Sequence, residues 1–72
     1  MRAALYARVS TADRGQDPEV QLAPLRALAA ARAWEVGEYT DRAPAADLRG
    51  RREWRLLLED ARLGRIDLVL VW

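Results

Sequence analysis

The chain has 72 residues, a formal net charge of +1 and 51% hydrophobic residues, so it has room for one small domain and is not a bulk polycation. It contains no cysteine and no histidine, which excludes disulfides, thiolate catalysis, cysteine zinc sites and a Ser-His-Asp relay. All 12 basic residues are arginine, a bias that GC-rich coding produces but that also suits phosphate binding.

No segment has the pattern of a signal peptide or a run of about 18 apolar residues. We therefore expect a cytoplasmic protein that does not enter a membrane. Any catalysis must depend on arginine, carboxylate, glutamine or hydroxyl groups. We expect neither a metal nor a cofactor.

The N-terminal segment predicts a strand followed by a polar loop. Residues 3–9, AALYARV, are short and apolar, as is typical of a buried strand. Residues 10–17, STADRGQD, are polar and contain a glycine, which indicates a loop. Asp17 and Pro18 then have the pattern of a helix cap followed by proline at the first helical position.

A helix is expected from Pro18 to about Arg32, with Leu22, Leu25, Leu28 and Ala29 at helical spacing. Pro24 conflicts with this pattern, so we expect either a kink there or a regular helix that starts near it. Residues 34–40, WEVGEYT, predict a second strand, weakened by a glycine. Residues 41–50, DRAPAADLRG, predict a loop.

A second helix is expected from the spacing of Trp54, Leu57, Leu58 and Ala61, with Gly64 as its C-terminal cap. Residues 66–72, IDLVLVW, form a continuous apolar run that predicts a strand buried on both faces. The tryptophans at positions 34 and 54 are expected in the core.

The order β-α-β-α-β predicts an α/β domain with a parallel sheet and right-handed crossovers. We expect three strands in the order 2-1-3, because the first crossover goes one way and the second the other. The most hydrophobic strand reaches the end of the sequence, so we expect the chain to be cut from a longer one.

Ligands of open parallel sheets bind beyond the carboxyl ends of the strands, which is where Ser10 is expected. Ser10 is the only serine, and Arg8 lies two residues before it, so both side chains project to one side of an extended strand. Gln21 lies at the start of the first helix, where backbone donors favour anions. These three residues could face one small anion. Alternatively, Arg8 forms a salt bridge, Ser10 caps a turn and Gln21 is an exposed helix residue.

Further charged residues flank the predicted helices. Arg49, Arg51 and Arg52 precede the second helix, either as a solvated loop or as an arm that closes over phosphate. The acids near the first helix match no metal-ligand spacing and are better explained as loop acids and a helix cap. The loop after the first strand also lacks the glycines and the lysine of a P-loop.

Several motifs in register resemble the N-terminal catalytic part of a serine recombinase, the resolvase/invertase family of site-specific DNA recombinases. They are YARVST at 6–11, Gln21, YTD at 39–41, R-x-x-W at 51–54 and LLEDARLGRIDLVLVW at 57–72. The resemblance covers almost the whole chain and implies a three-layer resolvase-like fold, present in part. It also implies DNA as the substrate, and homodimers or tetramers in the full-length family.

The resemblance implies a role for each candidate residue. Ser10 would attack a DNA phosphodiester, form a 5′-phosphoserine link and free a 3′ hydroxyl, and the link would be reversed after subunit rotation. Arg8 would contact the scissile phosphate, and Gln21 would be a hydrogen-bonding residue of the same site. Arg51 would clamp the phosphate, with Arg52 as the alternative, and Arg49 belongs to the same phosphate-binding set.

Two departures from the family pattern affect these expectations. Pro44 and Ala45 stand where the family usually has serine and glycine, so the loop that leads to Arg51 could be placed differently. The family continues with L-D-R-L-x-R, a dimerisation helix and a DNA-binding domain. We therefore expect residues 1–72 to be inactive alone. A non-catalytic interaction module and a small anion-binding α/β domain remain as alternatives.

Overall fold

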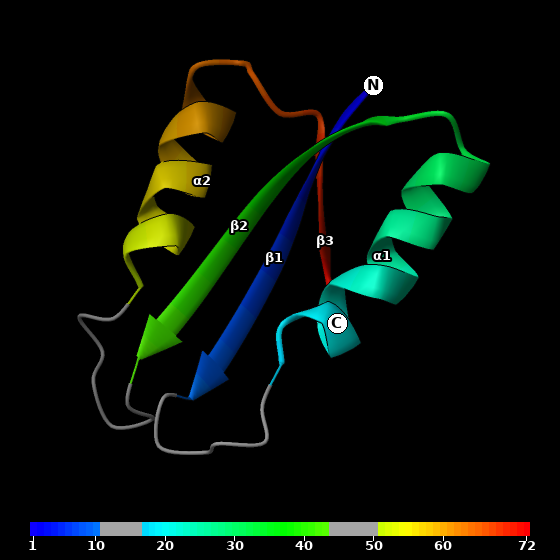
Figure 1. Cartoon of the computed structure of the whole chain (residues 1–72). Helices are drawn as coiled ribbons and strands as arrows, with labels where there is room; N and C mark the ends of the chain where they lie inside the picture. Colours follow the sequence, from blue (N-terminus) through cyan, green and yellow to red (C-terminus); the bar gives the residue numbers. More distant parts are fainter. Residues whose placement is uncertain (11–16, 44–50) are drawn as a thin grey trace.

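The computed structural model describes residues 1–10, 17–43 and 51–72 of the chain. Its elements follow in the order β1 (Arg2–Ser10), α1 (Glu19–Ala31), β2 (Glu35–Ala43), α2 (Arg52–Arg62) and β3 (Leu68–Val71). The three strands form one parallel sheet in the order β2-β1-β3 (Figure 1). The predicted α/β class and strand order are confirmed.

The central strand β1 supplies the core on both faces of the sheet, because alternate side chains of a strand point to opposite sides. On one face its residues pack against α1, in a cluster of Ala3, Leu5, Ala7, Leu22 and Leu25. On the other face its residues pack against α2, in a cluster of Ala4, Tyr6 and Leu57. The two helices thus cover opposite faces of the sheet, and the predicted three layers are confirmed (Figure 1).

The second strand is longer than the sequence predicts. Asp41, Arg42 and Ala43 were expected in a loop, but they continue β2 and pair with β1 as far as Ser10. The prediction was wrong here because it followed residue types that are common in turns. Pairing with β1, which the local sequence does not reveal, keeps these residues in the strand. The carboxyl ends of β1 and β2 therefore lie side by side.

Helix α1 runs through Pro24 as one element of 13 residues. Pro24 lies on the exposed side of the helix, so its ring does not disturb the core. At the start of the helix, the Asp17 carboxylate accepts a hydrogen bond of 3.0 Å from the Glu19 N–H. Asp17 therefore bonds to the helix start as expected, but Pro18 occupies the cap position and the helix begins one residue later than predicted, at Glu19.

Helix α2 buries a narrower stripe than its sequence predicts. Leu57 is fully buried, whereas Leu58 is 50% exposed and Ala61 is also exposed. Asp60 bonds to Tyr39 of β2, so this helix lies toward the β2 side of the sheet and leaves the Leu58 side uncovered. Gly64 follows the helix with φ = 76°, the left-handed conformation expected at this cap.

Strand β3 is buried on one face only, which corrects the expectation of burial on both. Leu68 and Leu70 pack on the α1 side of the sheet, while Val69 and Val71 are 40% and 60% exposed on the other. This strand lies at the sheet edge, on the side away from α2 (Figure 1). Two further corrections concern Trp34 and Trp54, which are half-buried at the margins of the two clusters and not inside them.

Candidate phosphate-binding site

A pocket of about 430 Å³ opens where β1 and β3 end, beside the start of α2. It is lined by Tyr6, Arg8, Gln21, Arg51, Trp54, Val71 and Trp72. Three of the four predicted catalytic residues, those at positions 8, 21 and 51, therefore line one pocket. The carboxyl edge of a parallel sheet is the usual place for a ligand in this class of fold.

Ser10 is the last residue of β1, two residues beyond Arg8. By strand alternation both lie on the same face as Tyr6, which is the α2 face, and both are half-buried. Ser10 is not among the described residues that line the pocket. The strand thus places Arg8 at the pocket and the Ser10 hydroxyl two residues further along the chain.

Gln21 contacts the backbone of Arg8 and not its guanidinium. The Gln21 amide donates from Nε2 to the Arg8 carbonyl at 3.0 Å, and its Oε1 accepts from the Arg8 N–H at 3.4 Å. The last residue pair between β1 and β3 is Tyr6 with Val71. Beyond this pair, the Gln21 amide makes the two backbone hydrogen bonds that a neighbouring strand would make to Arg8. The alternative of a merely exposed helix residue is therefore wrong. Gln21 holds the strand segment that carries Arg8.

Arg51 is the residue immediately before α2. The guanidinium carbon lies 5.1 Å from the centre of the Trp54 ring and 6.0 Å from that of Tyr6. These are cation–π distances. The buried Nε has no hydrogen-bond partner in the part of the chain that the structure describes.

The other two members of the predicted arginine cluster lie elsewhere. Arg52 is the exposed first residue of α2 and does not line the pocket. Arg49 lies outside the described residues, as do Pro44 and Ala45, so their predicted effects on the arm remain predictions.

Sequence reasoning missed Asp41 and Tyr6 as parts of this site. Asp41 is 4% exposed and accepts a 2.6 Å hydrogen bond from the Tyr6 hydroxyl. It also accepts from the N–H groups of Glu53 and Trp54, at 2.8 and 3.1 Å. A signal was present, because an aspartate at the end of a strand and before a helix is a good acceptor for helix amides.

The ionisation of this pair follows from its contacts. Burial alone would raise the pKa of Asp41, but the bonds from Tyr6 and the two amides outweigh it and hold that pKa below its usual value. Burial, together with the bond to Asp41, raises the pKa of Tyr6. At neutral pH the pair is therefore a carboxylate and a neutral phenol.

The ion pairs that the structure describes join side chains that do not line the pocket. The ion pairs join Arg2 to Glu35, Arg26 to Glu19 and Glu38, Arg62 to Glu59, and Arg65 to Asp60. The carboxylate of Asp41, which interacts electrostatically with Arg51, accepts hydrogen bonds from a phenol and two amides.

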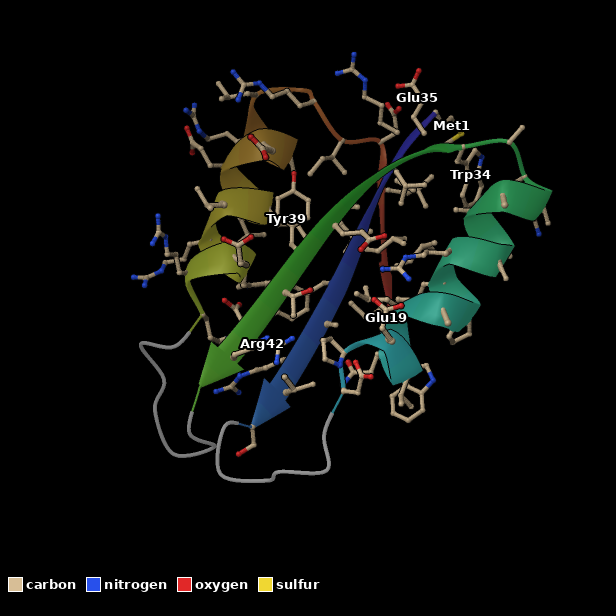
Figure 2. All side chains as sticks on the ribbon, viewed as in Figure 1. Met1, Glu19, Trp34, Glu35, Tyr39 and Arg42 are labelled. Carbon is tan, nitrogen blue, oxygen red and sulfur yellow. The ribbon has the colours of Figure 1, made fainter. Side chains whose placement is uncertain are left out.

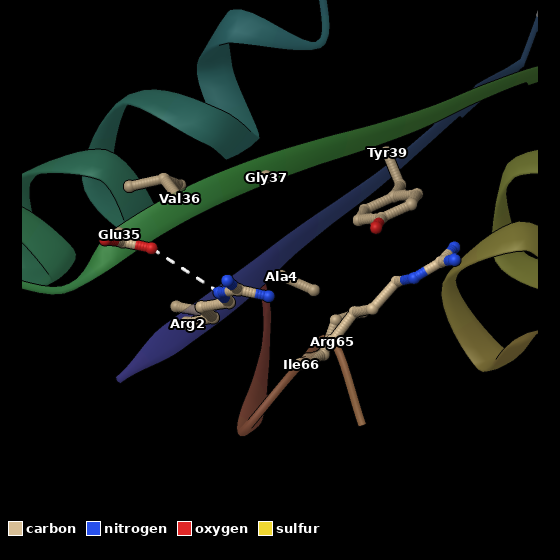
Figure 3. Close-up of a pocket in the computed structure, with 9 residues that line it drawn as sticks. Arg2, Ala4, Glu35, Val36, Gly37, Tyr39, Arg65 and Ile66 are labelled. Atoms are coloured by element: carbon tan, nitrogen blue, oxygen red, sulfur yellow. Dashed lines mark ion pairs between the residues drawn. The ribbon is translucent and has the colours of Figure 1, made fainter. Parts of the chain in front are cut away.

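Figure 2 shows that charged side chains surround both helices, with Arg42 near the end of β2. A second, smaller hollow of about 170 Å³ lies near the amino end of β1, where Arg2 pairs with Glu35 (Figure 3). Its other arginine, Arg65, pairs with Asp60. Both arginines of this hollow are thus paired with carboxylates.

Over residues 1–10, 17–43 and 51–72, no three acidic side chains lie together as a metal-binding group. Neither described helix is long and apolar enough to cross a membrane.

The fold and the pocket define an α/β domain with two arginines in a pocket at the carboxyl ends of its strands, where ligands of this fold class bind. The sequence model of the family described as "Resolvase, N terminal domain" matches residues 3–72. The chain therefore belongs to the resolvase family of serine recombinases, a family of DNA recombinases, and the resemblance found in its motifs is confirmed. No curated protein and no solved structure matches the chain significantly.

Proposed function

We propose that this chain provides the nucleophile and part of the phosphate site of an enzyme for site-specific DNA recombination. The observation that carries the proposal is that Arg8 and Arg51 line one pocket at the end of the strand whose last residue is Ser10. Two guanidinium groups at one pocket suit a phosphodiester, since arginine binds phosphate oxygens in pairs.

The proposed reaction is a transesterification. The Ser10 Oγ forms a bond to phosphorus as the bond from phosphorus to the 3′ oxygen breaks. The serine loses its proton and the released 3′ oxygen gains one, so the products are a 5′-phosphoserine link and a free 3′ hydroxyl. Reversal by another 3′ hydroxyl rejoins the strands without an external energy source.

The arginines lower the barrier by binding the charge that builds on the phosphoryl oxygens. A serine hydroxyl near its ordinary pKa is a weak nucleophile, and adjacent positive charge favours the alkoxide. Arg8 precedes Ser10 on the same face of β1, and Gln21 fixes the backbone there. Arg51 approaches from the start of α2 and contributes the second charge.

We propose that residues 1–72 need further groups for cleavage, including the distal catalytic segment, dimerisation helix and DNA-binding domain implied by the resemblance. The size of the pocket supports this, because about 430 Å³ is much larger than one phosphoryl group. The pocket is lined by two arginines and Ser10 does not line it. Additional residues could fill this space and bring nucleophile and phosphate together in a dimer or tetramer.

A second candidate function, an interaction module, is favoured by the edge strand. Val69 and Val71 expose apolar surface on β3, and Trp72 next to them is 73% exposed. An unprotected sheet edge can pair with another chain. Light scattering after size exclusion would show a concentration-dependent dimer if this function holds.

A chimera tests the proposed function without knowledge of the DNA site. Residues 1–72 would replace the corresponding segment of a characterised serine recombinase, which keeps its own dimer helix and DNA-binding domain. We expect recombination at the host enzyme's site, and its complete loss in Ser10→Ala. A chimera that binds this site as well as the host does, but cuts equally with serine or alanine at position 10, would contradict the proposal.

A further inference from the structure

The carboxylate of Asp41 joins three elements of the fold. It lies near the end of β2, and it bonds to the Tyr6 hydroxyl of β1 and to the N–H groups of Glu53 and Trp54 in α2. A buried carboxylate is costly unless its oxygens are bonded, and here Oδ1 accepts one hydrogen bond and Oδ2 accepts two. The three elements are therefore tied together at one point.

This carboxylate also serves as the N-terminal cap of α2. The residue in the cap position, Arg51, makes no capping bond with its own side chain and has φ = −123° and ψ = 39°. The acceptor for the first helix amides is Asp41, ten positions earlier and on another element. The backbone position of Arg51 is thus fixed by a contact between α2 and β2, and not by a local cap.

The surroundings of the Arg51 guanidinium depend on the same carboxylate. The guanidinium lies over the rings of Trp54 and Tyr6, which themselves meet edge to face with centroids 4.9 Å apart. Asp41 holds Trp54 in place through its backbone N–H, and it holds the ring of Tyr6 through the phenol hydroxyl. Both rings are therefore anchored by one acceptor.

We propose that Asp41 is a positioning residue for Arg51: it fixes the backbone before α2 and both aromatic rings, and so aims the guanidinium into the pocket beside Arg8. It does so without contacting the phosphate. The identification of this pocket as a phosphate site rests on the proposed function, whereas the orientation of Arg51 by Asp41 does not depend on it.

A neutral amide cannot replace this carboxylate. Asparagine has one side-chain oxygen, but three donors converge on position 41. With its oxygen toward Glu53, the amide nitrogen of Asp41→Asn would face the N–H of Trp54, donor against donor. At least one bond is lost, and so is the negative charge at the helix start. Tyr6→Phe is milder, because it keeps the ring and removes only the phenol bond.

The chain contains a matched control for this bond. Tyr39 donates to Asp60 at 2.6 Å, the same length as the bond from Tyr6 to Asp41, and it also joins a strand to α2. This second pair lies farther along the helix, away from the pocket. Tyr39→Phe and Asp60→Asn therefore remove a contact of equal chemistry that has no part in aiming Arg51.

The test observes the Nε–H resonance of Arg51 in nitrogen–proton NMR spectra, identified by its loss in Arg51→Lys. In the unaltered chain we expect its chemical shift to differ from those of the exposed arginines, because the guanidinium lies over two aromatic rings. In Tyr6→Phe and Asp41→Asn it should move toward the exposed arginines, while Tyr39→Phe and Asp60→Asn leave it in place. If Asp41→Asn does not fold, folded Tyr6→Phe decides. An unmoved resonance in the folded Tyr6 and Asp41 variants would overturn the proposal.

A titration with inorganic phosphate separates this inference from the function on which it draws. We expect Asp41→Asn to weaken phosphate binding by about fivefold or more, and Tyr39→Phe to change it by less than about twofold. Absence of phosphate binding to the unaltered chain would contradict the proposed phosphate site, while the Arg51 resonance would still report positioning. Equal binding by folded Asp41→Asn and the unaltered chain would count against the positioning role.

Discussion

The Gln21 side chain bonds to Arg8 through two backbone groups, as a neighbouring strand would. Its amide donates to the Arg8 carbonyl and accepts from the Arg8 N–H, just past the last β1–β3 pair. A residue of α1 thereby extends the sheet at the point where the candidate site begins. The position of Arg8 depends on this helix as well as on the strand.

Gln21→Glu should lower the free energy of unfolding by about 1–2 kcal/mol, because a carboxylate has no donor for the Arg8 carbonyl and repels it. Urea unfolding followed by circular dichroism measures the change. Ala27→Glu is the control, since it places the same side chain at an exposed position of α1. Equal stability of the two variants would mean that the bonds to Arg8 contribute nothing.

Leu57→Ala should lower the free energy of unfolding by about 2–5 kcal/mol, because Leu57 is fully buried. A loss of this size is enough to unfold so small a domain. Leu58→Ala removes the same atoms from a side chain that is 50% exposed and should cost about 1 kcal/mol or less. Thermal unfolding of both variants gives the comparison. A larger loss for Leu58→Ala would show that α2 presents a different face to the sheet.

Acid should destabilise the fold partly through Asp41. The pKa of this carboxyl is lower in the folded than in the unfolded chain, so its contribution is complete above the unfolded value of about 3.9 and is lost as pH falls through the folded value. The contacts of Glu19, Glu38, Glu59 and Asp60 lower their pKa values as well. Unfolding measured from neutral pH to about pH 2 should therefore show a shallower acid loss in Asp41→Asn than in the unaltered chain. An unchanged slope would contradict the low pKa of Asp41.

High pH should destabilise the fold through ionisation of its two tyrosines, which are the only ones in the chain. The hydrogen bond to Asp60 and then burial raise the pKa of Tyr39 to about 12, and burial and Asp41 raise that of Tyr6. Because these pKa values are raised on folding, stability is complete below the unfolded value of about 10 and falls as pH rises toward 12. Ultraviolet titration should show little phenolate at pH 10, and Asp60→Asn should lower only the Tyr39 transition. Ionisation of both tyrosines near pH 10 in the folded chain would refute the assignment.

The fold was predictable because β1 and α2 carry strong local patterns and the β-α-β-α-β order leaves few topologies. Local patterns could not predict where a strand ends when pairing with its neighbour decides the boundary. Asp41 was assigned to a loop by its residue type, yet β1 draws it into β2. The apolar run at the end of the sequence suggested burial on both faces, but Val69 and Val71 are exposed and neither described helix covers them.

The site was predictable in part, for a similar reason. Arg8, Gln21 and Arg51 were expected from the motifs that resemble the family, and the pocket brings them together. The roles of Tyr6 and Asp41 come from a bond between residues 35 positions apart, which no local pattern contains. The backbone contact of Gln21 is likewise visible only once α1 has been placed beside the end of β1.

The central claim, that Ser10 attacks a DNA phosphate next to these arginines, is tested most directly by locating the covalent link. The chimera described above would be stopped during cleavage, digested with trypsin and nuclease, and analysed by fragmentation mass spectrometry. We expect a nucleotide phosphate on Ser10 in the peptide of residues 9–14. A link on Thr11 or on any other residue, or no link in a chimera that binds and cuts its site, would contradict it.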